Sequence, residues 1–185
     1  MRSIATLIAF FLAMTGAKAQ GLAPSDIEGL KVDTNVTMAM RSRSAGREIS
    51  GQTVLQWTFE LGAEKAIKGR LERIYSSGGQ VRGRREHKFN SKIDVPEKGF
   101  EATTVWLVQQ NELIQLITTN VGGWKLTLHL NKSADDRWSC KATYERFQEL
   151  GKGHNRNLGV AEGAQDQEIE ILSASQIKST CAVSR

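Results

Sequence analysis

Apolar and polar residues alternate along most of this chain, and this pattern constrains the fold more than any other feature of the sequence. Between residues 30 and 40, apolar side chains and Thr34 occupy the even positions, while charged and polar side chains fill most of the odd positions. A period of two is typical of a β-strand with one buried face. Residues 53–61, 100–108, 124–130 and 138–144 repeat the pattern. The sequence therefore predicts an all-β protein.

Short polar or glycine-rich segments separate these runs and predict antiparallel hairpins. Two-residue turns are expected at 110–111 and at 122–123, which would set Val108 opposite Leu113 and Ile117 opposite Leu128. A polar, glycine-rich loop is expected over about 148–167, followed by two short closing strands. We therefore expect an antiparallel up-and-down meander of about eight to ten strands, forming a barrel-like or strongly curved sheet that leaves few strand edges exposed.

The hairpin around Gly78-Gly79 allows two registers. A two-residue loop would place apolar residues opposite charged ones, for example Tyr75 opposite Arg82. A three-residue loop sets Tyr75 opposite Val81 and Ile67 opposite Phe89, so the sequence favours this second register. The second register also predicts two ion pairs between the strands, Glu72 with Arg84 and Arg70 with Glu86.

Residues 1–19 have the features of a signal peptide. Arg2 supplies a positive charge, and residues 4–14 form an apolar run too short to span a bilayer core of about 30 Å as a helix. Ala17 and Ala19 are the small residues that precede a cleavage site. We expect cleavage before Gln20, a periplasmic or secreted location, and one soluble β-domain over residues 20–185 that does not span a membrane. The alternative is an N-terminal membrane anchor or a buried helix.

The two cysteines, Cys140 and Cys181, both have the parity of the apolar face of a predicted strand. In an exported protein, an even pair of cysteines is expected to form a disulfide. The sequence has no Cys-x-x-Cys spacing and no histidine at local ligand spacing from either cysteine, so a metal site is not favoured. A structural disulfide between Cys140 and Cys181 is therefore predicted.

No motif in the sequence indicates catalysis. The three histidines are scattered singly, and the sequence contains no Gly-x-Ser-x-Gly elbow and no phosphate-binding glycine loop. We predict that the protein is not an enzyme and uses no metal or cofactor. Loss of Arg2 and Lys18 with the leader lowers the net charge from +5 to +3. This weak charge and the expected export argue against a nucleic-acid partner.

Positive charge is concentrated between residues 65 and 92, which hold nine lysines and arginines against two glutamates. Most of these side chains fit a solvated outer face, but Arg73, Arg85 and His87 share the parity of the apolar residues. A charge on a buried face is costly unless it is paired, near an edge, or in contact with water. These residues therefore either form a basic spot on the concave face or lie at a strand end and reach water.

The leading functional hypothesis is non-catalytic binding of a small amphipathic or anionic ligand on the concave face. Its candidate residues combine arginine, which can bind an anion with two hydrogen bonds, with aromatic surface; they are Arg73, Tyr75, Arg85, His87, Trp57 and Trp106. The alternative is a cell-envelope interaction module whose basic hairpin contacts an anionic polymer, a lipid headgroup or a protein partner. A third hypothesis is an enzyme whose site is assembled from residues far apart in the sequence. The directions of Arg73 and Arg85 distinguish the first two hypotheses.

Overall fold

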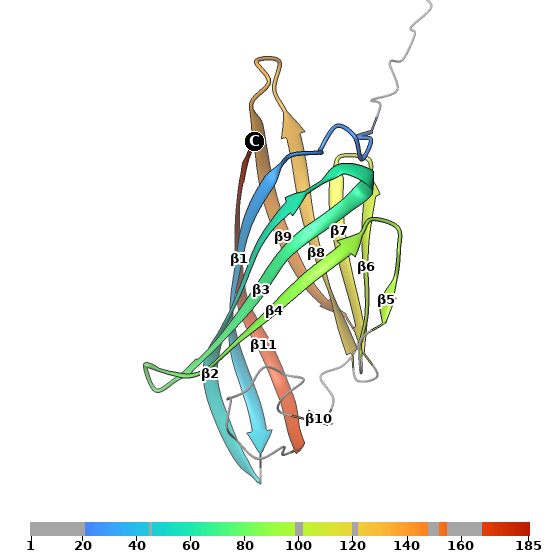
Figure 1. Ribbon diagram of the computed structural model, residues 1–185. Coiled ribbons are helices and arrows are strands. Elements are labelled where there is room, and N and C mark those ends of the chain that lie inside the picture. Colours follow the sequence, from blue (N-terminus) through green and yellow to red (C-terminus); the bar gives the residue numbers. More distant parts are fainter. Residues whose placement is uncertain (1–20, 45, 99–101, 120–121, 148–151, 155–167) are drawn as a thin grey trace, which may run out of the picture.

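The computed structural model describes residues 21–44, 46–98, 102–119, 122–147, 152–154 and 168–185 (Figure 1). The expected signal peptide and most of the expected loop at 148–167 lie outside these residues. The strands are β1 (Lys31–Ser44), β2 (Arg47–Leu61), β3 (Ala66–Ser77), β4 (Gln80–Lys92), β5 (Glu97–Lys98), β6 (Ala102–Gln109), β7 (Glu112–Thr119), β8 (Gly122–Lys132), β9 (Trp138–Phe147), β10 (Lys152–His154) and β11 (Glu168–Ser184). The one helical turn in the described part is η1 (Ala63–Lys65), so no helix there is long and apolar enough to cross a membrane.

The strands form two antiparallel sheets. Sheet A has the order β10-β11-β1-β2-β3-β4, and sheet B has the order β5-β6-β7-β8-β9. Neighbours in sequence are mostly neighbours in space, as the commonest hairpin connections require. The predicted all-β, antiparallel up-and-down arrangement is therefore confirmed. The described strands are hydrogen-bonded as two separate sheets, not as one closed cylinder.

The core lies between the two sheets, which Figure 1 shows packed against each other. Sheet A contributes Val32, Val36 and Trp57, and sheet B contributes Leu113 and Leu128, each at most 1% exposed. Alternate residues of a strand point to opposite faces, so the alternation in the sequence places these side chains on the inner faces. The buried side chains of both sheets form one hydrophobic cluster.

One side of this core is joined by β9 and β11. The predicted disulfide links Cys140 of β9 to Cys181 of β11, with their Cα atoms 5.6 Å apart. Beside it, the hydroxyl of Ser179 donates a hydrogen bond of 2.6 Å to the carbonyl oxygen of Ala142. The disulfide therefore ties sheet A to sheet B.

On the other side, the segment that follows β4 lies against β6. Ile93 forms an isolated bridge with Trp106, and the amide of Asp94 donates a hydrogen bond of 2.7 Å to the carbonyl oxygen of Trp106. At one end of the molecule, β1, β2 and β11 extend beyond the ends of the sheet B strands (Figure 1). The inner face of sheet A is therefore longer than the face of sheet B that covers it.

The turn between β3 and β4 differs from the three-residue loop that the sequence favours. Gly78 and Gly79 both have positive φ and form a two-residue turn. Such a turn needs positive φ at its central residues, which glycine adopts without steric cost. A β-bulge between Tyr75 and Ser76 then shifts the pairing by one residue. Turn and bulge together change the pairs but preserve the predicted parity from Gly83 to Lys92. Beyond the bulge the predicted parity is wrong, because Val81 lies opposite Ser76 and is exposed.

The predicted pairs of Tyr75 with Val81 and of Ile67 with Phe89 are therefore wrong. Tyr75 lies opposite Gly83 instead, and the same register sets Arg73 directly opposite Arg85. The two predicted ion pairs are present as diagonal contacts between strands, Arg84 Nε to Glu72 Oε1 at 3.0 Å and Arg70 Nη1 to Glu86 Oε2 at 3.8 Å.

Four further expectations can be compared with the strands. Val108 lies opposite Leu113 as predicted, but the expected turn at 122–123 is wrong because β8 already begins at Gly122. Ile117 is therefore paired with Trp124 and not with Leu128. The two expected closing strands are one strand, β11, whose pairing with β1 contains two register shifts. Within the expected loop, residues 152–154 form β10 at the edge of sheet A.

Candidate ligand-binding site

Arg73 of β3 and Arg85 of β4 lie side by side on the inner face of sheet A. They belong to one row across the sheet, in which Val36 pairs with Leu55, Leu55 with Arg73, and Arg73 with Arg85. Val36 and Leu55 are buried, whereas both arginines are partly buried. Residues directly opposite in an antiparallel pair point to the same face. The parity argument for the two arginines is therefore confirmed.

Sheet B presents a second cross-strand pair to these arginines, Trp124 of β8 opposite Arg146 of β9. The Cζ atom of Arg73 lies 5.1 Å from the centre of the Trp124 ring, within cation–π distance. Arg146 Nη1 lies 3.8 Å from the Sδ atom of Met40 on β1. Side chains from both sheets therefore meet here. We call Arg73, Arg85 and Arg146 the arginine cluster.

The environment of Arg73 is unfavourable for a positive charge. Burial lowers the pKa of its guanidinium, the charge interaction with Tyr144 raises it, and the charges of Arg85 and Arg146 lower it further. Part of the Arg73 surface still reaches solvent. Arginine nevertheless stays protonated in proteins because its ordinary pKa lies far above neutral pH. The result is a concentration of positive charge in a partly desolvated place.

Tyr144 lies on the same face of β9 as Arg146 and is buried. Burial raises the pKa of its hydroxyl to about 12, although Arg146 and Arg73 act in the opposite direction. Tyr144 therefore remains a neutral hydrogen-bond donor and acceptor at neutral pH. Its ring is 6.3 Å from the ring of Trp57, so the aromatic core continues directly from the arginine cluster.

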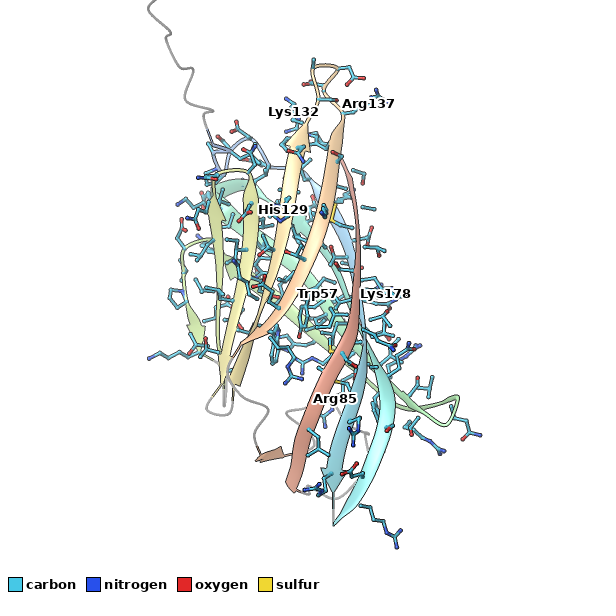
Figure 2. The ribbon with its side chains drawn as sticks, turned by 180° about the vertical axis from the view of Figure 1, so that it is seen from behind. Trp57, Arg85, His129, Lys132, Arg137 and Lys178 are labelled. Atoms are coloured by element: carbon cyan, nitrogen blue, oxygen red, sulfur yellow. A yellow bond between two sulfur atoms is a disulfide. The ribbon has the colours of Figure 1, made fainter. Side chains whose placement is uncertain are left out.

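The structure separates the two predicted tryptophans. Trp57 lies in the middle of the molecule, and Arg85 lies nearer the end where sheet A extends beyond sheet B (Figure 2). Trp106 packs instead against Phe59 and Phe89, with ring centres 5.1 and 5.9 Å away. Trp57 therefore adjoins the arginine cluster through Tyr144, whereas Trp106 belongs to a different aromatic group.

Tyr75 and His87 flank the arginine row on its two sides. Tyr75 follows Arg73 on the same face of β3 and is buried. His87 lies opposite Leu71 in the preceding row and is exposed. The sequence therefore places both residues near the cluster, but only Tyr75 is part of the buried interior.

Sequence reasoning missed three residues of this site, Arg146, Trp124 and Tyr144. The sequence pattern could have identified Arg146. The alternation that begins at Trp138 continues through Tyr144 to Arg146, which puts a third arginine on an apolar parity. No local pattern shows that Trp124 and Arg146 face Arg73, since that contact depends on how the two sheets pack.

The outer face of the β3–β4 hairpin is chemically different. Its arginines alternate with acidic partners, and Glu86 contacts both Arg70 and Lys88, at 3.8 and 3.7 Å. The Arg84 side chain is 65% exposed although it pairs with Glu72. Exposed pairs of this kind stabilise a protein little and partly neutralise each other. The inner arginines therefore form the more concentrated basic site.

Within the described ranges, no group of three or more histidine, cysteine, aspartate or glutamate side chains could hold a metal ion. The chemistry that the arginine cluster offers is recognition of an anion by charge and by directed N–H groups. Comparison of the chain with known protein families, with curated proteins and with solved structures found no match.

Proposed function

We propose that this protein is an exported, non-catalytic binding protein for a small anionic amphiphile held on the inner face of sheet A. The observation that carries the proposal is the contact between two cross-strand pairs, Arg73–Arg85 from sheet A and Trp124–Arg146 from sheet B. Positive charge and aromatic surface are thereby combined at one place between the sheets.

The energetics favour an anion at this position. Like charges directly opposite each other in a β-sheet destabilise the pair. Desolvation adds a further cost, which falls when an anion of suitable shape contacts the guanidinium groups. A charge-assisted hydrogen bond contributes about 1.5–3 kcal/mol, roughly twice the value of a neutral one. An anion that contacts these guanidinium groups would therefore gain charge-assisted hydrogen bonds at this row.

Apolar surface beside the cluster supports an amphipathic ligand over a simple inorganic ion. Met40 contacts Arg146, and the Trp124 ring lies under Arg73. The indole nitrogen atoms of Trp57 and Trp124 are buried and donate hydrogen bonds to no other residue that the structure describes. Ligand sites typically combine such apolar walls with a few convergent polar groups.

The proposed location is the periplasm or the exterior of the cell. It is supported by the leader features of residues 1–19 and by the disulfide between Cys140 and Cys181, since disulfides persist mainly in oxidising compartments.

The test compares two neighbouring arginines on opposite faces of β4. Binding of decyl sulfate and decanoate to the mature protein is measured by calorimetry and by tryptophan fluorescence, with decyl maltoside as the uncharged control. Arg85→Ala should weaken binding of the anionic amphiphiles about tenfold to more than a hundredfold, and Arg84→Ala should leave it almost unchanged. The thermal stability of each variant is measured alongside. If wild-type protein binds no anionic amphiphile, the proposal is wrong.

A second candidate function uses the outer face of the β3–β4 hairpin as a cell-envelope interaction surface. The hairpin projects from the body of the molecule in Figure 1, and Val81 at its tip is 61% exposed beside Arg82. An exposed apolar residue among arginines suits an anionic polymer, a lipid headgroup or a protein partner. Equal, salt-sensitive losses of binding in Arg84→Ala and Arg85→Ala would favour this candidate.

A further inference from the structure

We infer that the outer edge of β4 is a dimerisation surface, at which two copies of this chain pair antiparallel and join their A sheets. This inference does not rest on the proposed function, because it uses the backbone of β4 and not the arginine cluster. Figure 1 shows β4 as the last strand of sheet A, so one of its edges is paired with no other strand in the described part of the chain. An unpaired edge is a template for a further strand.

The hydrogen-bond pattern identifies the residues of this edge. The amide of Ile93 donates a hydrogen bond of 2.9 Å to the carbonyl oxygen of Lys65, so these two residues form a hydrogen-bonded pair. In an antiparallel ladder such pairs alternate with pairs whose backbone groups point away from each other. The register therefore gives outward backbone groups to every second residue of β4, namely Arg84, Glu86, Lys88, Asn90 and Lys92.

Four of these residues form a regular edge. Lys92 does not belong to it, because its carbonyl oxygen accepts a hydrogen bond from the amide of Val95 and the chain then crosses to sheet B at Ile93. At the other end the edge stops at the β-bulge, where Arg82 pairs with no residue of β3. Among the residues that the structure describes, none is hydrogen-bonded to the outward backbone groups in between. We call these four residues the β4 edge: Arg84, Glu86, Lys88 and Asn90.

The charges along the β4 edge favour one alignment of two copies. With Glu86 opposite Lys88 of the partner subunit, all four edge residues are paired, and the two-fold axis repeats this ion pair. Arg84 then lies opposite Asn90 of the partner subunit, so no like charges face each other. A shift by two residues in one direction sets Glu86 opposite itself, and the same shift in the other direction sets Lys88 opposite itself. Like charges directly opposite destabilise a sheet, so these alternatives are disfavoured.

The size of the contact agrees with a reversible dimer. Each of the four pairs can form two main-chain hydrogen bonds, which approaches the roughly ten hydrogen bonds of a typical interface. The side chains of Arg84 and Lys88 are 65% and 83% exposed, so they can adjust to a partner strand. A single strand pair buries an area at the low end for specific complexes. We therefore expect a dissociation constant in the micromolar range.

The experiment measures the mass of the mature, disulfide-bonded wild-type protein by sedimentation equilibrium at increasing concentration. We expect a monomer–dimer equilibrium. Asn90→Pro should weaken the dimer about tenfold or more, because it removes an outward N–H group, and proline is tolerated on edge strands at such positions. Asn90→Ala keeps the N–H group and is the matched control, which should dimerise like the wild type.

Further variants test the alignment. Glu86→Lys and Lys88→Glu should each weaken the dimer about tenfold, since both symmetry-related ion pairs become like-charge pairs. The double variant Glu86→Lys/Lys88→Glu again has opposite charges across the interface and should dimerise within about threefold of the wild type. His87→Cys should form a disulfide between the subunits, because His87 lies opposite itself in this alignment and cross-strand Cα distances suit a disulfide.

The outcomes decide the inference. A wild type that stays monomeric at every concentration overturns it, also where the monomer binds poly-glutamate at this edge instead. A dimer that is equally tight in Asn90→Pro and Asn90→Ala does not use the β4 edge and overturns it too. A double charge variant as weak as the single variants refutes the alignment. Thermal unfolding of each variant is recorded, and the wild-type measurement decides if a variant does not fold. Failure of the dimer leaves the anionic-amphiphile proposal standing.

Discussion

Removal of the Cys140–Cys181 disulfide should lower the free energy of unfolding by about 4 kcal/mol. The two cysteines are 41 residues apart in sequence, and they join β9 of sheet B to β11 of sheet A. In the chain-entropy treatment, a cross-link that closes a loop of this length removes about 13 cal/mol/K from the entropy of the unfolded chain, or about 4 kcal/mol at 25 °C. For a domain of this size the corresponding fall in Tm is roughly 8–16 °C.

The assay is urea unfolding of oxidised wild-type protein and of the double variant Cys140→Ala/Cys181→Ala. The midpoint should fall, and the slope m should rise, because the unfolded chain without the cross-link exposes more surface. Ser179→Ala is the matched control. It removes a single hydrogen bond between β11 and β9 and should cost only about 1 kcal/mol. A double variant within 1 kcal/mol of the wild type, or no more destabilised than Ser179→Ala, would refute the entropic reasoning.

Three further predictions concern packing, ionisation and processing. Gly69→Ala should destabilise the protein by about 1–3 kcal/mol in urea unfolding, because the added methyl group would overlap the Cβ of Phe59 and the carbonyl oxygen of Thr58; a change below 0.5 kcal/mol would contradict this packing. The folded-state pKa of Tyr144, about 12, lies above its ordinary value of 10.0. As the pH rises from 10 to 12, Tyr144 therefore loses its proton first in the unfolded state. The free energy of unfolding of the wild type should fall by up to about 3 kcal/mol relative to Tyr144→Phe over this range, and this ionisation should not affect stability at pH 8. Parallel pH profiles of the free energy of unfolding of the two proteins would contradict this prediction. The intact mass of the exported protein should correspond to a chain that begins at Gln20. An uncleaved chain in the membrane fraction would contradict the signal-peptide prediction.

The alternation of residues was sufficient to predict which face of most strands is buried. Val32, Val36 and Trp57 are buried because side-chain direction along a strand is a local property of the backbone. The same local property placed Arg73 and Arg85 on the inner face and Arg84 on the outer face. It would also have placed Arg146 with them, had the alternation of β9 been followed two residues further.

The pairing between strands was harder to predict from the sequence than the buried faces. At 110–111 a simple two-residue turn allowed the correct pair, Val108 with Leu113. In the β3–β4 hairpin the register depends on a glycine turn and a bulge next to Tyr75. A bulge changes the pairing by one residue while local propensities hardly change, so the sequence pattern contains little information about it. An even error in register leaves each face correct, which explains why the predicted parity from Gly83 to Lys92 survived the wrong pairs.

The sequence by itself determined the all-β class, the buried faces and the pairing of its two cysteines, because these depend on local periodicity and on the number of cysteines. Only the tertiary structure decided that Trp124 and Arg146 meet Arg73, and that Trp106 lies apart with Phe59 and Phe89. These contacts join residues far apart in the chain across two sheets. They are set by the packing of one whole sheet on the other. That packing depends on the sum of many small contact energies, so no short segment of the sequence determines it.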